Sequence, residues 1–263
     1  MKPQKLLCYL FPVAAGLGTA WLRYTAIDRA VDPGTGIPSS TGWLTAAYGV
    51  IAGVLVLLLL YTFLMGKRQG PSPALLGSPV YRVLYVVAGL LFLASAAFAF
   101  FSLADTDASA LSLVEAIFAI ACGLCVLFRL KVQPTSETAG TLLLIPVFYS
   151  AYTLLVFYRN NNANPLIYSF ATELFAFLAV MFAMYATAAF HFGKRRPRLL
   201  RFASMAGIYL LVTVLCSDNL LPFFTKGHLH FDAADLLTMG GFLVLLCAHL
   251  FVLEPLPRGV RQD

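Results

Sequence analysis

Eight long apolar runs constrain the fold of this chain more than any other feature of its sequence. Each is 18 to 28 residues long, and an α-helix needs about 20 residues to cross a hydrocarbon core about 30 Å thick. Only helices and closed barrels satisfy their backbone hydrogen bonds inside a bilayer, and the alternating pattern of barrel strands is absent. The runs are residues 6–27, 43–65, 80–103, 108–130, 141–158, 165–192, 199–221 and 233–253. The sequence therefore predicts an all-α fold, a bundle of eight transmembrane helices in a single domain over residues 1–263.

The composition is outside the range of soluble globular proteins. Apolar residues make up 60% of the chain and charged residues 11%, against about 45–50% and about 25% in soluble domains. The 18 Lys and Arg outnumber the 12 Asp and Glu, but they lie beside the apolar runs, where they set orientation in a membrane. We therefore expect the lipid bilayer, and no nucleic acid, as a partner.

The distribution of basic residues predicts how the helices are oriented. With the N-terminus inside, 14 of the 18 Lys and Arg fall in cytoplasmic segments. The other four, Arg23, Arg29, Arg159 and Lys226, fall outside. We expect both termini in the cytoplasm and a multi-pass protein of the cell membrane.

The first apolar run has two interpretations. A signal peptide has an apolar core of about 7 to 15 residues before a cleavage site of small residues, and residues 18–20 would provide such a site. The run continues, however, through Trp21 and Tyr24, aromatic residues typical of a membrane interface. We favour an uncleaved span, with the signal peptide as the alternative.

The run 165–192 contains one carboxylate, Glu173, and one imidazole, His191. They are 18 residues apart, or five helical turns, and so share one face of the predicted helix. A charge facing lipid costs a few kcal/mol, so Glu173 should face a cavity, form a pair or be protonated. The two readings are a polar stripe for helix packing and a route for a substrate or protons.

Three further acids, Glu115, Asp218 and Asp235, lie near the predicted outer ends of other runs. If these helices are neighbours, the acids form a ring in the outer half of the bundle. Such a ring suits a cation or a cationic solute. The sequence therefore predicts substrate or proton binding by Glu115, Glu173, Asp218, Asp235 and His191.

One loop has the composition of a metal site. His228, His230 and Asp232 project to one side in an extended segment, and imidazole with carboxylate suits zinc. The intervening Leu229 and Phe231 equally suggest a segment at the membrane interface. Apart from this possible zinc site, we expect no cofactor.

A strongly basic loop follows the run 165–192 and is a candidate surface for a membrane or cytoplasmic protein partner. Its cations are Lys194, Arg195, Arg196, Arg198 and Arg201. The segments between runs are too short for a soluble catalytic domain, and no phosphate-binding glycine loop, zinc-protease helix or serine nucleophile elbow occurs.

Three functions follow, in order of preference. The first is a small transporter or permease-like protein with an outward-facing acidic cavity for a cationic solute or protons. The second is a non-enzymatic sensor or assembly subunit that acts through the basic loop. The third, an intramembrane metal-dependent enzyme using the loop histidines, is the least favoured, so we do not expect enzymatic activity.

Overall fold

The computed structural model of the chain is built almost entirely from helices. It describes residues 3–31, 42–64, 69–71, 73–105, 110–133, 136–162, 170–192, 196–227 and 231–255. The long helices are α1 (Pro3–Ala30), α2 (Gly42–Leu64), α4 (Pro79–Asp105), α5 (Ala110–Phe128), α6 (Glu137–Asn161), α7 (Ala171–His191), α8 (Pro197–Val214) and α10 (Ala233–Phe251). The short elements are β1 (Gln69–Pro71), α3 (Pro73–Leu76), η1 (Arg129–Lys131), η3 (Leu215–Leu220), α9 (Leu221–Lys226) and β2 (Leu253–Pro255).

The helices are of the length and composition that a membrane requires. Within the described residues, seven segments are long and apolar enough to cross one: 42–64, 79–101, 111–131, 137–161, 171–191, 197–226 and 233–251. The remaining long helix, α1, has 28 residues and is about 42 Å long at about 1.5 Å per residue. The predicted helical, multi-pass membrane fold is therefore confirmed.

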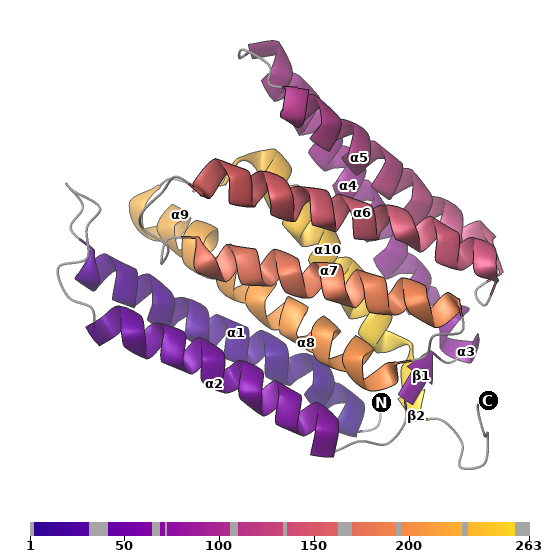
Figure 1. Ribbon diagram of the computed structural model, residues 1–263, viewed down its shortest axis with the longest axis horizontal. Coiled ribbons are helices and arrows are strands. Elements are labelled where there is room, and N and C mark those ends of the chain that lie inside the picture. Colours follow the sequence, from indigo (N-terminus) through magenta and orange to yellow (C-terminus); the bar gives the residue numbers. More distant parts are fainter. Residues whose placement is uncertain are drawn as a thin grey trace.

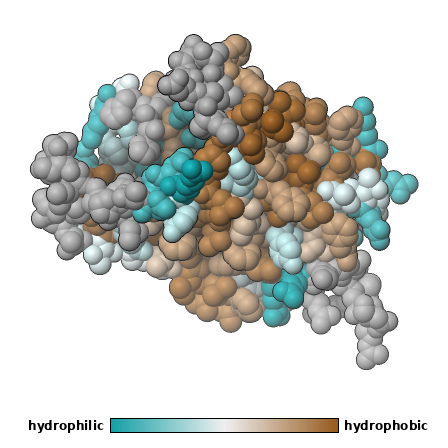
Figure 2. Space-filling model, turned by 45° about the horizontal axis from the view of Figure 1, so that its top comes forward, coloured by the Kyte–Doolittle hydropathy of each residue, from teal (hydrophilic) through white to brown (hydrophobic). Residues whose placement is uncertain are grey.

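Apolar side chains cover much of the outside of the bundle. On the face in Figure 2, brown apolar residues occupy most of the middle, and teal polar residues gather mainly towards the edges. Leu64 on α2 is 81% exposed, Phe101 on α4 is 72% exposed and Leu155 on α6 is 66% exposed. Such a surface would drive association in water, whereas in a bilayer it faces lipid.

Six of the long helices form a closed ring of neighbours. Around this ring, α8 packs on α7, α7 on α6, α6 on α5, α5 on α4, α4 on α10, and α10 on α8. The hairpin of α1 and α2 lies outside the ring and packs against α8 (Figure 1). Because helices cover it on several sides, the segment 197–226, which begins with α8, has 78% of its most apolar 18 residues buried, against 22% for α2.

Aromatic side chains fill the space between α4, α6 and α10. The ring centroids of Phe92 and Phe242 are 5.0 Å apart, and Tyr149 lies 5.6 Å from Phe242 and 5.9 Å from Phe92. All three residues have an exposed fraction of 0%. These contacts lie in the range that favours edge-to-face packing, so this part of the ring is a packed core.

Small residues bring neighbouring helices close together. A Cβ atom added to Gly89 on α4 would lie 2.7 Å from Leu127 Cγ on α5, and one added to Gly123 would lie 3.0 Å from the carbonyl oxygen of Gly89. This close approach is the usual device of membrane helices, which gain little from the hydrophobic effect and depend on packing.

Two helix starts differ from the prediction. α6 begins at Glu137, four residues before the predicted start at 141, because Ser136 Oγ accepts a hydrogen bond from the Ala139 N–H at 3.2 Å and caps the helix. α7 begins at Ala171, later than the predicted 165, and residues 163–169 lie outside the described part. Glu173 therefore lies in the first turn of α7 rather than two turns into it.

The end of the seventh run also differs from the prediction. The sequence predicts that the run ends at residue 221, because Asp218, Asn219 and Pro222 are typical of a helix end. In the structure the helix continues through η3, a π-helical turn, into α9 as far as Lys226. Pro222 has no N–H for the carbonyl four residues earlier, and a π-helical turn accommodates this loss. The helix ends at Gly227, whose φ of 73° is in the left-handed region that glycine adopts without strain.

A short antiparallel pair joins two distant loops. Gln69 pairs with Pro255, Gly70 with Glu254 and Pro71 with Leu253. The pair lies at the end of the bundle where α1 begins (Figure 1). It connects the segment after α2 with the segment after α10.

Candidate functional site

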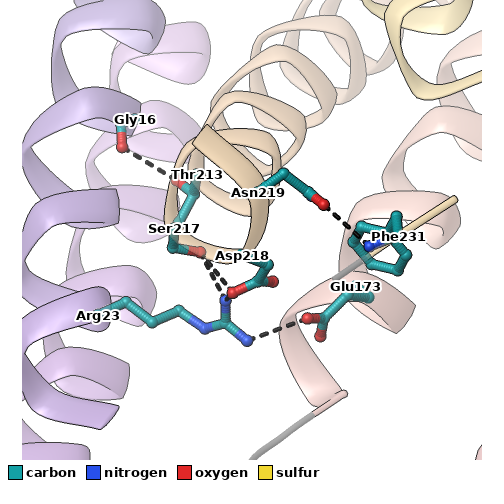
Figure 3. Close-up of polar contacts among 8 residues, drawn as sticks. All are labelled: Gly16, Arg23, Glu173, Thr213, Ser217, Asp218, Asn219 and Phe231. Carbon is teal, nitrogen blue, oxygen red and sulfur yellow. Dashed lines mark hydrogen bonds and ion pairs between the residues drawn. The ribbon is translucent and has the colours of Figure 1, made fainter. Parts of the chain in front are cut away.

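A buried arginine from α1 joins two acids from two other helices (Figure 3). Arg23 Nη2 donates to Glu173 Oε1 on α7 at 3.0 Å. Its Nη1 donates to Asp218 Oδ1 in η3 and to Ser217 Oγ, the latter at 2.6 Å. We call Arg23, Glu173, Ser217 and Asp218 the Arg23 cluster.

The Arg23 cluster is enclosed by the bundle. Arg23 is 2% exposed, Glu173 1% and Asp218 7%. Charges removed from water in this way are stable only as pairs with further hydrogen bonds. Two residues of this cluster, Arg23 and Ser217, are not among the site residues predicted from the sequence. The sequence does indicate that Arg23 needs a partner, because it lies within the first apolar run and charged residues inside membrane helices normally form pairs.

The cluster contains more negative than positive groups. One guanidinium faces two carboxyl groups, so the charge is −1 if both carboxyls are ionised. The second oxygen of each, Glu173 Oε2 and Asp218 Oδ2, is buried and has no hydrogen-bond partner among the described residues. An added proton or cation would balance this charge.

The π-helical turn presents consecutive polar residues to the interior. Ser217, Asp218 and Asn219 are all buried. The Ser217 hydroxyl donates to Asp218 Oδ1 at 2.9 Å, and Asn219 Oδ1 accepts from the Phe231 N–H at 2.9 Å (Figure 3). Single π turns of this kind occur frequently at functional sites.

The four predicted acids fall into two groups. Glu173 and Asp218 share Arg23, while Glu115 on α5 and Asp235 on α10 interact electrostatically with each other and with Asp232. The Asp232 carboxylate caps α10, because its Oδ1 accepts from the Asp235 N–H at 2.8 Å. The structure thus brings the acids together in pairs.

His191 lies at the opposite end of α7 from Glu173. At 18 residues of separation the two are about 27 Å apart along the helix axis. His191 Nε2 is 3.1 Å from Arg129 Nη2, at the end of α5. The structure does not join His191 to the Arg23 cluster.

The predicted basic surface is only partly described. Lys194 and Arg195 lie outside the described residues, and Arg196 and Arg198 are exposed at the start of α8. Arg201 is buried, with its guanidinium 4.7 Å from the centroid of the Tyr61 ring. Arg201 therefore contributes to packing, whereas Arg196 and Arg198 are open to a partner.

The predicted zinc site also lies mostly outside the described residues. This applies to His228 and His230, and the third member, Asp232, is the cap of α10. Within the described residues, no group of three or more His, Cys, Asp or Glu is arranged to hold a metal ion. Zinc binding by the loop stays a prediction.

Comparison of the chain with protein-family models, with curated proteins and with solved structures finds no match. The interpretation of the site therefore depends on its geometry and charge.

Proposed function

We propose that the protein is a small transporter coupled to protons, with the Arg23 cluster as its proton-binding centre. The observation that carries this proposal is that one buried guanidinium is shared by two buried carboxyl groups on different helices. Ionisable groups inside a membrane bundle are costly and commonly mark proton or substrate routes.

The charge of the cluster supports a proton as the coupling ion. With one cation and two acids, binding one proton makes the cluster neutral. A neutral cluster is less costly in a medium of low dielectric constant than one with a net charge. The bound proton would sit on one of the two carboxyl groups and leave the other as the ionised partner of Arg23.

Protonation would also determine which helix forms an ion pair with Arg23 of α1. While Glu173 is ionised, Arg23 links α1 to α7; while Asp218 is ionised, it links α1 to α8 through η3. Neutralising one acid weakens one link and leaves the other. Coupled transport requires a bound ion that favours one of two arrangements of the packed helices, and a proton bound here would do this.

A cationic solute could use the same acids. An incoming ammonium or guanidinium group would compete with Arg23 for Glu173 and Asp218, and would replace the internal cation during transport. Tyr48 of α2 also lies within electrostatic range of Arg23 and would be part of the surroundings of such a solute.

Infrared difference spectroscopy of the protein in lipid tests the proton-binding step without a known solute. A protonated carboxyl group in the Arg23 cluster gives a C=O band that disappears as pH rises. We expect this band in the wild type and its loss or shift in Glu173→Gln and Asp218→Asn. The control is Glu137→Gln, which changes an exposed acid in the first turn of α6.

Proteoliposomes containing a pH-sensitive dye test the transport step. A panel of small organic cations and neutral solutes is added outside, and internal pH is followed. We expect a solute-dependent change that falls about tenfold or more in Glu173→Gln and Asp218→Asn, equivalent to about 1.4 kcal/mol, and persists in Glu137→Gln. Unchanged behaviour in both cluster variants would contradict the proposal and favour a sensor or assembly role.

A further inference from the structure

A second polar cluster lies at the other end of the bundle, and its charge is of the opposite sign. It contains Arg129 of η1, His191 and Thr187 of α7, Tyr81 and Tyr85 of α4, and His249 of α10. We call these residues the Arg129 cluster. Arg129 is 4% exposed, Tyr85 is 0% exposed and His249 is 3% exposed. By the positive-inside prediction, this end faces the cytoplasm.

The hydrogen bonds of the Arg129 cluster identify both histidines as neutral. The Thr187 hydroxyl donates to the Ala183 carbonyl at 2.8 Å, so its oxygen accepts from His249 Nδ1–H at 3.2 Å. A second proton, on Nε2, would place another cation beside the buried Arg129, so the ring is neutral and Nε2 accepts from the Tyr85 hydroxyl at 2.8 Å. Since an arginine only donates, His191 Nε2 must accept from Arg129 at 3.1 Å.

The charge of Arg129 is therefore not balanced within the described residues. It has no carboxylate partner there, and His191 contributes a lone pair but no charge. The centroid of the Tyr85 ring lies 5.8 Å from the guanidinium carbon, a cation–π contact. The C-terminal end of helix α5 adds a favourable dipole. These dipoles offset only part of the cost of burying a cation.

Two buried donors in this cluster also make no hydrogen bond of good geometry within the described residues. They are Arg129 Nε–H and the hydroxyl of Tyr81, which is 3% exposed. The Tyr81 and Tyr85 rings are 4.4 Å apart and their hydroxyls interact, so the Tyr81 hydroxyl and the guanidinium, near Tyr85, belong to one site. A buried positive charge beside such donors suits a ligand that accepts hydrogen bonds and carries negative charge.

We propose that the Arg129 cluster binds a phosphate group, either free or in a lipid headgroup, through Arg129 and Tyr81. The planar guanidinium fork suits phosphate. Lys131, two residues further along, is exposed, and its ammonium nitrogen lies 5.8 Å from the centroid of the Phe128 ring. Basic sites between membrane helices at the cytoplasmic side commonly bind anionic headgroups, and a soluble anion would meet the same donors. This proposal is independent of the function of the Arg23 cluster.

Gly140 allows α6 and α7 to approach closely beside this site. A Cβ atom added to Gly140 on α6 would lie 2.7 Å from the Cβ of His191 and 3.2 Å from the Phe192 ring. A side chain there pushes the end of α7 away from α6 and moves His191. Gly140→Ala is therefore a variant that disturbs the site without changing any of its polar groups.

Two probes separate the sources of the anion. The first is radiolabelled inorganic phosphate, added to full-length protein in a detergent free of phospholipid. The second is phosphatidylglycerol, whose retention by the protein is compared with that of phosphatidylcholine by native mass spectrometry. Binding of phosphate identifies a soluble oxyanion as sufficient, whereas selective retention of phosphatidylglycerol alone identifies a lipid headgroup; either result supports the proposal.

Four variants test the residues. We expect Arg129→Gln to weaken binding of the active probe about tenfold or more and Tyr81→Phe about threefold to tenfold, in line with the loss of hydrogen bonds to a charged group. Gly140→Ala should also weaken it. Arg198→Gln is the matched control, because Arg198 is an exposed arginine at the same end, and it should change binding less than about twofold.

Three results would overturn the proposal. One is that neither probe binds the wild type, which means that the charge is balanced from within the chain or by water. Another is equal loss in Arg198→Gln and Arg129→Gln, which means that binding depends on general surface charge. The third is unchanged binding in Tyr81→Phe, a variant that keeps all charges and the ring and so remains informative if Arg129→Gln does not fold.

Discussion

Arg23 of α1 and Asp218 of η3 are 195 residues apart in the sequence and form a buried ion pair in the structure. Asp218 lies in a π-helical turn, which places its carboxyl group on the guanidinium that also binds Glu173 of α7. The pair therefore connects α1, the helix that begins the chain, to the most enclosed part of the bundle.

Removing the guanidinium should destabilise the protein strongly. Arg23→Gln leaves two buried carboxyl groups with no cation, and breaking a buried pair in this way costs about 3–5 kcal/mol. We expect the free energy of unfolding in mixed micelles to fall by this amount. Arg29→Gln is the control, since Arg29 is exposed one and a half turns further along α1, and it should change the free energy by less than about 1 kcal/mol.

The two acids should behave non-additively. In Glu173→Gln or Asp218→Asn alone, Arg23 keeps one carboxylate, so each change should cost less than about 1 kcal/mol of unfolding free energy. The double variant leaves Arg23 buried without a counter-ion and should cost about 3–5 kcal/mol, more than the sum of the two single changes. A double-mutant cycle of unfolding free energies measures this. Simple additivity would show that Arg23 does not depend on either acid.

The sequence predicts the helices of this bundle well because hydropathy is a local property. Each of the eight apolar runs overlaps one of the long helices. The exception is the predicted end of the seventh run at residue 221, where Asp218, Asn219 and Pro222 are typical signals of a helix end but the helix continues through η3 into α9. These signals failed because the polar side chains find partners inside the fold, Arg23 for Asp218 and the Phe231 N–H for Asn219.

The candidate site is predictable only in part, because the contacts that form it join residues far apart in the sequence. The sequence identifies Glu173 and Asp218 as costly groups that need partners, but the partner comes from a helix 150 residues before Glu173. Which helices are neighbours is a property of the whole bundle. The same limit applies to His191, which shares a helix with Glu173 but has Arg129 as its partner.

Close packing of α1 on α8 holds Arg23 in place. A Cβ atom added to Gly16 would lie 2.9 Å from Val212 Cγ1 and 3.0 Å from the Tyr209 carbonyl oxygen, whereas one added to Gly18 meets nothing within 4 Å. We expect Gly16→Ala to lower the unfolding free energy by about 1–3 kcal/mol, the usual cost of overpacking. Gly18→Ala, in the same helix, should be neutral or stabilising by up to about 1 kcal/mol. Equal effects of the two variants in thermal unfolding would show that α1 does not pack as described.

Both termini are predicted to be cytoplasmic, and labelling of single cysteines tests this orientation. In a background without the five native cysteines, Arg198→Cys introduces an exposed thiol at the start of α8, and Lys226→Cys introduces one at the end of α9, where the lysine pairs with Asp28 and is 49% exposed. The positive-inside distribution places 14 of 18 basic residues on the side of Arg198. A membrane-impermeant maleimide added to intact cells should therefore label the cysteine at position 226 and leave the one at 198 unlabelled until the membrane is opened. Each position is the control for the other, because both are polar and exposed in the folded protein. Labelling of position 198 in intact cells would invert the bundle, put the Arg23 cluster near the cytoplasm and place the Arg129 cluster on the outer side.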